Sequence, residues 1–213
     1  MRTWAVGFWL ALTLGAAAQP FADQRGPVVR LAATGPVVTS FAELRTPPAT
    51  CYTPDQLLRM SEPQLLALYT AAEPGPLLTG YAPGTMIFNP GSPLTVPTAR
   101  VVHATAWQGK YFDDDQMTNR AFGLRAVTTP VEVGASYVDG RPSLVFDYAG
   151  SRPFFVRRYR DEVREVSPGV YLGIMHRRDH RGATIATWFA LDGRGRYAPP
   201  PAAIAGPPSR TGP

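Results

Sequence analysis

The stretch RDEVREVSPGVYLG, residues 160–173, decides the fold that the sequence predicts. A run of strand-forming residues ends at the turn signal Ser167-Pro168-Gly169, and a second apolar run follows it. Two such runs separated by a tight turn are typical of an antiparallel hairpin. The stretch therefore predicts two neighbouring strands.

The first of these strands carries charge on both faces. Asp161 and Glu165 share one face, whereas Arg160, Glu162 and Arg164 share the other. A half-buried strand keeps one face apolar, so this strand lies either at a sheet edge or beside a cavity in which its charges are paired. We favour the cavity, where an inward carboxylate needs an arginine partner because an unpaired buried charge is costly. The candidate partners are Arg125, Arg160 and Arg164.

Further strands are predicted on both sides of this hairpin. The β-forming runs are roughly 101–112, 117–128, 131–138, 142–148, 154–166, 170–177 and 183–191. The turn signals between them include Asp113–Asp115, the two-residue hairpin signal Asp139-Gly140, and Asp179–Gly182. Seven closely spaced strands predict a mainly β fold, an antiparallel meander that closes into a barrel to hide its edges.

Two short helices are predicted before the strands, within residues 54–72. Thr53 with Pro54 and Ser61 with Pro63 each place a capping residue before a proline in the first turn. We expect these helices to cap one mouth of the barrel. The predicted barrel domain spans residues 51–193, between a proline-rich linker at 19–50 and a proline-rich tail at 194–213, both without a core.

Met1–Ala18 has the features of a secretory signal peptide. Arg2 supplies the positive charge, residues 4–14 are apolar, and Ala16–Ala18 are small residues at the cleavage position. The apolar run is short for a membrane-spanning helix. We therefore expect an exported protein, located in the periplasm or outside the cell.

The composition limits the classes of partner. The 213 residues include 21 lysine and arginine residues, 16 acidic residues and one cysteine, so no internal disulfide framework is available. The arginines are scattered, and Lys110 is the only lysine. Nucleic-acid binding requires a clustered basic face, so we expect none. A weak attraction to anionic membrane surfaces and the oligomeric state are left open.

The aromatic segment WQGKYF, residues 107–112, is the second unusual strand. Alternation places Trp107, Gly109 and Tyr111 on one face and Gln108, Lys110 and Phe112 on the other. Trp107 either plugs one end of the barrel or stacks on a ligand. The predicted wall of the barrel consists of Phe122, Leu124, Leu144, Phe146, Tyr148, Tyr171, Met175 and Trp188. Asp147, which faces away from this wall, is expected to pair with an arginine.

Few residue patterns suggest catalysis or metal binding. The three histidines lie on different predicted elements, and His176, which alternates with Leu172 and Ile174, is expected in the core or a pocket wall. The Asp113–Asp115 turn could bind calcium but is expected to be solvated, and nothing converges on Cys51. No phosphate-binding or nucleophile-elbow motif is present, and we expect no cofactor and no metal.

Several motifs together resemble a family of uncharacterised bacterial proteins. They are W-x-G-K-x-F at 107–112, D-G-x-P-S at 139–143 and the stretch at 160–173. That family looks like a lipocalin-type (calycin) barrel, and the resemblance implies binding of a small hydrophobic ligand rather than catalysis.

The sequence thus favours an exported, lipocalin-like β-barrel that binds a small hydrophobic or amphipathic, lipid-like ligand. The candidate ligand-binding residues are Trp107, Arg125, Phe146, Tyr148, Asp161, Glu162, Arg164, Tyr171 and His176. One alternative is a hydrolase that acts on a lipid or ester through Asp161, Glu162 or His176. Another is an envelope interaction protein with a filled core and no ligand.

Overall fold

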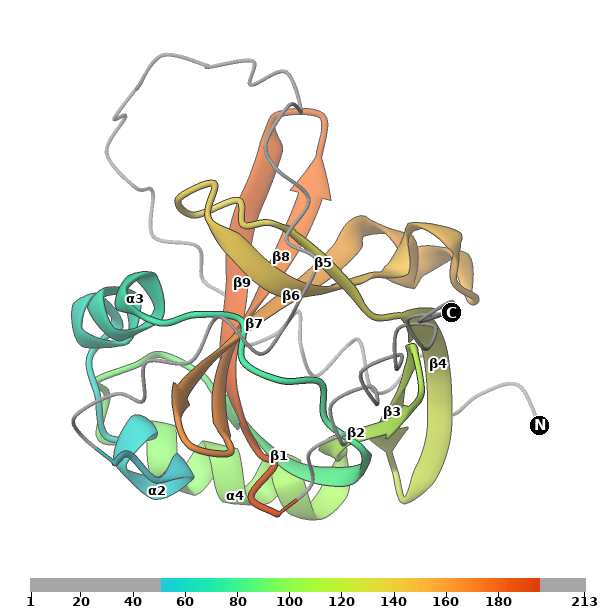
Figure 1. Ribbon diagram of the computed structural model, residues 1–213. Helices are drawn as coiled ribbons and strands as arrows, with labels where there is room; N and C mark the ends of the chain where they lie inside the picture. The colour runs from blue at the N-terminus through green and yellow to red at the C-terminus, as the bar shows by residue number, and fades with distance from the viewer. Residues whose placement is uncertain (1–50, 196–213) are drawn as a thin grey trace, which may run out of the picture.

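The computed structural model describes residues 51–195, which form one curled antiparallel sheet with a few helices (Figure 1). Within these residues nine strands follow the order β4-β3-β2-β1-β9-β8-β7-β6-β5. Their bounds are β1 Gly80–Ile87, β2 Trp107–Asp113, β3 Gln116–Ala121, β4 Leu124–Pro130, β5 Glu132–Ala135, β6 Pro142–Asp147, β7 Tyr159–Ser167, β8 Val170–Asp179 and β9 Gly182–Asp192. The predicted signal peptide, linker and nearly all of the predicted tail lie outside the described residues.

Strand β1 joins two meanders, β2–β4 and β5–β9. Its first half, Gly80–Pro83, pairs with β2, and its second half, Gly84–Ile87, pairs with β9. The partner changes at Gly84, where the ring of Trp107 occupies the space that a side chain would need, so the position requires glycine. β1 is therefore the corner at which the sheet bends.

The sheet curls into a half-barrel, and its edge strand β4 approaches the end of β6 without forming a backbone ladder with it. Between β4 and the end of β6, the Thr129 hydroxyl donates to the Asp147 carbonyl at 2.5 Å. The Ser151 hydroxyl donates to the Thr128 carbonyl at 3.0 Å. We call this line of contact the seam. In the described residues it is bridged by these side-chain hydrogen bonds rather than by a backbone ladder.

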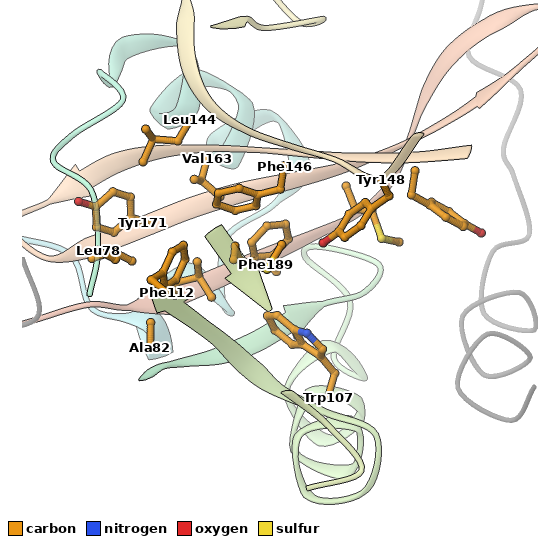
Figure 2. Close-up of a cluster of buried hydrophobic side chains, with 14 of the residues drawn as sticks. Leu78, Ala82, Trp107, Phe112, Leu144, Phe146, Tyr148, Val163, Tyr171 and Phe189 are labelled. Atoms are coloured by element: carbon orange, nitrogen blue, oxygen red, sulfur yellow. The ribbon is translucent and has the colours of Figure 1, made fainter. Parts of the chain in front are cut away.

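The two faces of the sheet carry two separate apolar cores. The inner core fills the concave side, with Phe112, Phe146 and Phe189 in the middle and Trp107 and Tyr148 toward one end (Figure 2). The outer core lies under the helices α2 (Pro54–Leu57), α3 (Glu62–Ala71) and α4 (Thr95–Thr105) and includes Trp188. Both faces of the central strands are therefore buried.

The structure corrects three of the predicted strands. Thr95–Thr105 is the helix α4, so the strand predicted from 101 begins only at Trp107. The run 117–128 is split by a turn at Phe122 and Gly123, both with positive φ. The run 154–166 begins with the 3-10 helix η3, Phe154–Arg158.

These differences also correct the predicted wall. Phe122 and Leu124 lie at an exposed turn rather than inside, and Trp188 lies in the outer core. The predicted turns at Ser167–Gly169 and Asp179–Gly182 are confirmed. The Asp139-Gly140 signal belongs to a longer loop, residues 136–141, rather than to a two-residue turn. Among residues 51–195, no helix is long and apolar enough to cross a bilayer.

Candidate functional site

The charged strand β7 lies inside the sheet, between β6 and β8. It is therefore not an edge strand, and four of its charged residues are buried with at most 8 % of each exposed. These residues are Arg160, Asp161, Glu162 and Arg164. Alternation directs Asp161 into the half-barrel and the other three to the outer face, so β7 contributes to two polar clusters.

The inner cluster is built around an ion pair between Lys110 of β2 and Asp161 of β7. Lys110 Nζ lies 2.8 Å from Asp161 Oδ2, and it also donates to Asn119 Oδ1 at 2.8 Å and to the Tyr148 hydroxyl at 3.0 Å. An ammonium group has three hydrogens to donate. Lys110 is therefore fully hydrogen-bonded although only 1 % of it is exposed.

The neighbours of this pair complete a closed network. The Tyr148 hydroxyl donates to Asp161 Oδ2 at 2.7 Å and accepts from Asn119 Nδ2 at 3.1 Å. Trp107 Nε1 donates to Asn119 Oδ1 at 3.1 Å. Within the described residues, Asp161 Oδ1 is buried without any hydrogen-bond partner. The network thus leaves one strong acceptor free.

Aromatic rings surround the ion pair. Lys110 Nζ lies between 5.2 and 5.7 Å from the ring centroids of Trp107, Phe146, Tyr148 and Phe189. Burial lowers the pKa of Lys110, an effect that Asp161 opposes. Burial, reinforced by the Asp161 charge, raises the pKa of the Tyr148 hydroxyl well above its ordinary value. Tyr148 therefore acts as a neutral hydrogen-bond donor.

The inner cluster lies behind the seam. Asn119 is half-buried, and Val127 of β4 and Phe155 of η3 pack as partly buried residues against the inner core. Val127 is the extra residue of a bulge between β3 and β4 and has φ +60°, a strained conformation for a β-branched residue. Strain of this kind is concentrated at binding and active sites. The seam therefore combines a strained backbone position with partly buried side chains next to the cluster.

The outer cluster is built around Glu162. The Ser136 hydroxyl donates to Glu162 Oε2 at 2.5 Å, and the backbone N–H of Tyr137 donates to both carboxylate oxygens. Arg160 Nη1 lies 3.2 Å from Glu162 Oε1. His176 Nε2 lies 3.4 Å from Glu162 Oε2, but this contact does not have the geometry of a hydrogen bond. Burial opposes the ionisation of Glu162, but His176 and Ser136 outweigh it, so the pKa of this carboxyl lies below its ordinary value.

Arg164 continues the outer cluster. Its guanidinium holds Asp139 through two hydrogen bonds of 2.7 Å and donates to the Tyr69 carbonyl at 3.1 Å. The hydrogen bond from Arg164 lowers the pKa of Asp139. Together, Glu162 and Arg164 fix the loop 136–141 onto the outer face, which is a structural role.

The predicted binding residues are therefore divided among three places. Trp107, Phe146, Tyr148 and Asp161 meet around Lys110, and Tyr171 lies farther along the inner core, where its hydroxyl donates to the Pro76 carbonyl at 2.5 Å (Figure 2). Glu162, Arg164 and His176 belong to the outer cluster. Arg125 lies on the exposed side of β4, with its guanidinium 4.2 Å from the Tyr111 ring centroid.

Sequence reasoning missed Lys110 and Asn119. The inward carboxylate Asp161 pairs with Lys110 rather than with an arginine, and Lys110 shares the inner side with Trp107 although alternation separates them. The reason is a break in the β2–β3 register between Trp107 and Gly109. The available signal was Lys110 itself, the one lysine of the chain, placed in an aromatic strand.

A surface hollow of about 680 Å³ lies over β2–β4, and its lining includes Tyr111, the Asp113–Asp115 turn, Thr118 and Arg125. It is wide and polar, and the inner cluster does not line it. Asp147 pairs with Arg178 at 2.6 Å, as predicted for an arginine partner. Among residues 51–195, no group of three or more histidine, cysteine, aspartate or glutamate side chains could hold a metal ion.

Comparisons with known proteins add little to this geometry. No protein-family model and no curated protein matches the chain. A crystal structure of a protein from Thermomonospora curvata is similar to it at 18 % sequence identity, over 65 % of this chain and 90 % of that chain, with a TM-score of 0.42. A likeness of this size says nothing about ligand or activity.

Proposed function

We propose that the protein is an exported, lipocalin-like binding protein that holds a small amphipathic ligand behind the seam. The observation that carries the proposal is the free acceptor Asp161 Oδ1, buried among aromatic rings beside a fully hydrogen-bonded lysine. A buried acceptor without a donor costs free energy, so native proteins rarely leave one unpaired. A polar ligand group would supply the missing donor.

The surroundings support the same function. Ligand sites combine an apolar lining with a few fixed polar groups, and here Trp107, Phe146 and Phe189 surround the polar group Lys110–Asp161. The seam offers an entrance because no backbone ladder closes it. The signal-peptide features of Met1–Ala18 support an exported protein, which would meet lipid-like molecules that need a carrier in water.

The test is ligand binding by the purified full-length protein. Native mass spectrometry of protein from a bacterial culture should show a bound molecule of a few hundred daltons. The neutral dye N-phenyl-1-naphthylamine should bind saturably, with quenching of tryptophan fluorescence. The matched control Arg125→Ala should bind equally well, because Arg125 lies on the exposed side of β4. Absence of both a bound molecule and saturable dye binding would refute the proposal.

A further inference from the structure

We propose that the polar end of the ligand is a neutral hydrogen-bond donor, such as a hydroxyl or an amide N–H, and not a carboxylate. This inference rests on the proposed function and names the class of ligand that the inner cluster selects. It follows from which atoms of the cluster are already used and which are not.

The cluster has no free cation to offer to an acid. All three hydrogens of Lys110 are taken by Asn119, Tyr148 and Asp161 at 2.8–3.0 Å. A fatty acid would have to displace one of these acceptors before Lys110 could pair with it. A carboxylate is bound most strongly by a cation with free donors, and Lys110 has none left to offer.

The free position of the cluster accepts hydrogen bonds. The hydroxyl hydrogen of Tyr148 and the indole N–H of Trp107 are both donated within the network. The unpartnered buried atom is Asp161 Oδ1, a carboxylate oxygen that can only accept while the group is ionised. A ligand carboxylate placed there would meet a like charge at hydrogen-bond distance, whereas a hydroxyl would donate to it.

The net charge of the cluster favours a neutral group over a cation. Lys110 and Asp161 cancel each other, and burying one more charge without a partner is costly. An alkylamine would leave the buried cluster with an excess positive charge. An alcohol or an amide supplies the donor and leaves the charge balanced.

The apolar part of the ligand is assigned to the seam. Val127 and Phe155 are partly buried on its two sides and pack against the inner core. A chain that enters between them reaches the cluster beside the half-buried Asn119. The proposed ligand is thus a long-chain alcohol, an acylglycerol or an N-acyl amide.

The experiment compares three ligands with the same ten-carbon chain at pH 8: decanol, decanoate and decylamine. Each competes with N-phenyl-1-naphthylamine for the full-length protein, and native mass spectrometry counts the bound molecules. Decanol should bind at least tenfold more tightly than either charged ligand. The wild-type protein alone decides this comparison, so the result does not depend on the folding of a variant.

The variant Asp161→Asn tests whether the Asp161 charge sets the order of the ligand affinities. Asp161→Asn removes the negative charge that repels a ligand carboxylate, so the preference for decanol over decanoate should become smaller than in the wild-type protein. Circular dichroism verifies that the variant is folded, and Asp113→Asn, in the exposed turn, is the matched control that should retain the wild-type order.

The outcomes separate the two proposals. If decanoate or decylamine binds the wild-type protein as tightly as decanol, the inference about the ligand's polar end is wrong, but the proposed binding function still holds. Failure of the dye and all three ligands to bind would overturn both.

Discussion

Lys110 and Asp161 form a buried ion pair surrounded by aromatic rings. Each charge therefore needs the other to offset the cost of its burial. Lys110→Met leaves the Asp161 carboxyl buried without its counter-charge. We expect this change to reduce the free energy of unfolding by about 3–5 kcal/mol, measured by urea denaturation.

The double variant Lys110→Met/Asp161→Leu gives the control for this prediction. In Lys110→Met, the free energy of unfolding is reduced because the buried Asp161 carboxyl has no counter-charge. The double variant has no such carboxyl, so it should be more stable than Lys110→Met. A single variant of near wild-type stability would mean that the pair is solvated.

Glu162 and Asp139 should make stability depend on pH. Both carboxyl groups have a pKa below the ordinary value in the folded protein. Their contribution is therefore complete above the unfolded values, about 4.3 and 3.9, and is lost as the pH falls through the folded values.

The measurement is urea unfolding between pH 7 and pH 3. The free energy of unfolding should change little, as far as these two groups are concerned, down to about pH 5 and decline below about pH 4. Glu162→Gln should show a smaller decline than wild type, whereas the exposed control Asp113→Asn should keep the wild-type slope. Equal slopes in all three proteins would contradict the assignment.

At the scale of residues, the sequence predicts part of the inner cluster. A two-residue period and aromatic character, both visible in the chain, single out Asp161, Trp107, Phe146 and Tyr148. Lys110 was not, because a register break is set by how two strands pair and not by either strand alone. Arg125 was a plausible partner by charge, but the sheet places it on the exposed side.

At the scale of elements, the contact between β8 and β9 tests how tightly the inner core is packed. A side-chain carbon at Gly173 would lie 2.2 Å from the ring of Phe189, whereas one at Gly150 would meet nothing within 4 Å. Gly173→Ala should therefore destabilise the protein by about 1–3 kcal/mol, with Gly150→Ala within about 0.5 kcal/mol of wild type. Thermal and urea unfolding of both variants give the comparison, and equal stabilities would show that Phe189 moves aside without cost.

The elements that sequence reasoning misassigned have a common cause. In α4, the β-branched pair Val101-Val102 favours a strand locally, but the helix packs Val102 against the inner core and leaves Val101 62 % exposed. The Phe122-Gly123 turn lacks the usual Asn-Gly or Asp-Gly signal. Tertiary contacts determined both, and a single sequence does not display them.

At the scale of the molecule, residues 51–195 already enclose two complete cores. We expect a chain of residues 46–195 to unfold cooperatively, with a melting temperature within a few degrees of the full-length protein, because the proline-rich composition of the ends predicts little burial of apolar surface. Differential scanning calorimetry compares the two chains. A loss of more than about 10 °C would show that a removed end adds a strand or covers the seam.

The corner strand β1 also sets the order in which the chain can fold. The pairs within β2–β4 and within β5–β9 are neighbours in sequence, but β1 meets β9 only across long separations, such as that between Ile87 and Thr187, 100 positions apart. Loops of that length close slowly, so the pairs within β2–β4 and within β5–β8 can form early, while the joining of the two halves waits for β9, the last strand of the described residues. Lys110 and Asp161 stand on opposite sides of this late junction. A nascent chain that has not reached β9 therefore lacks the strand that joins the two halves of the sheet.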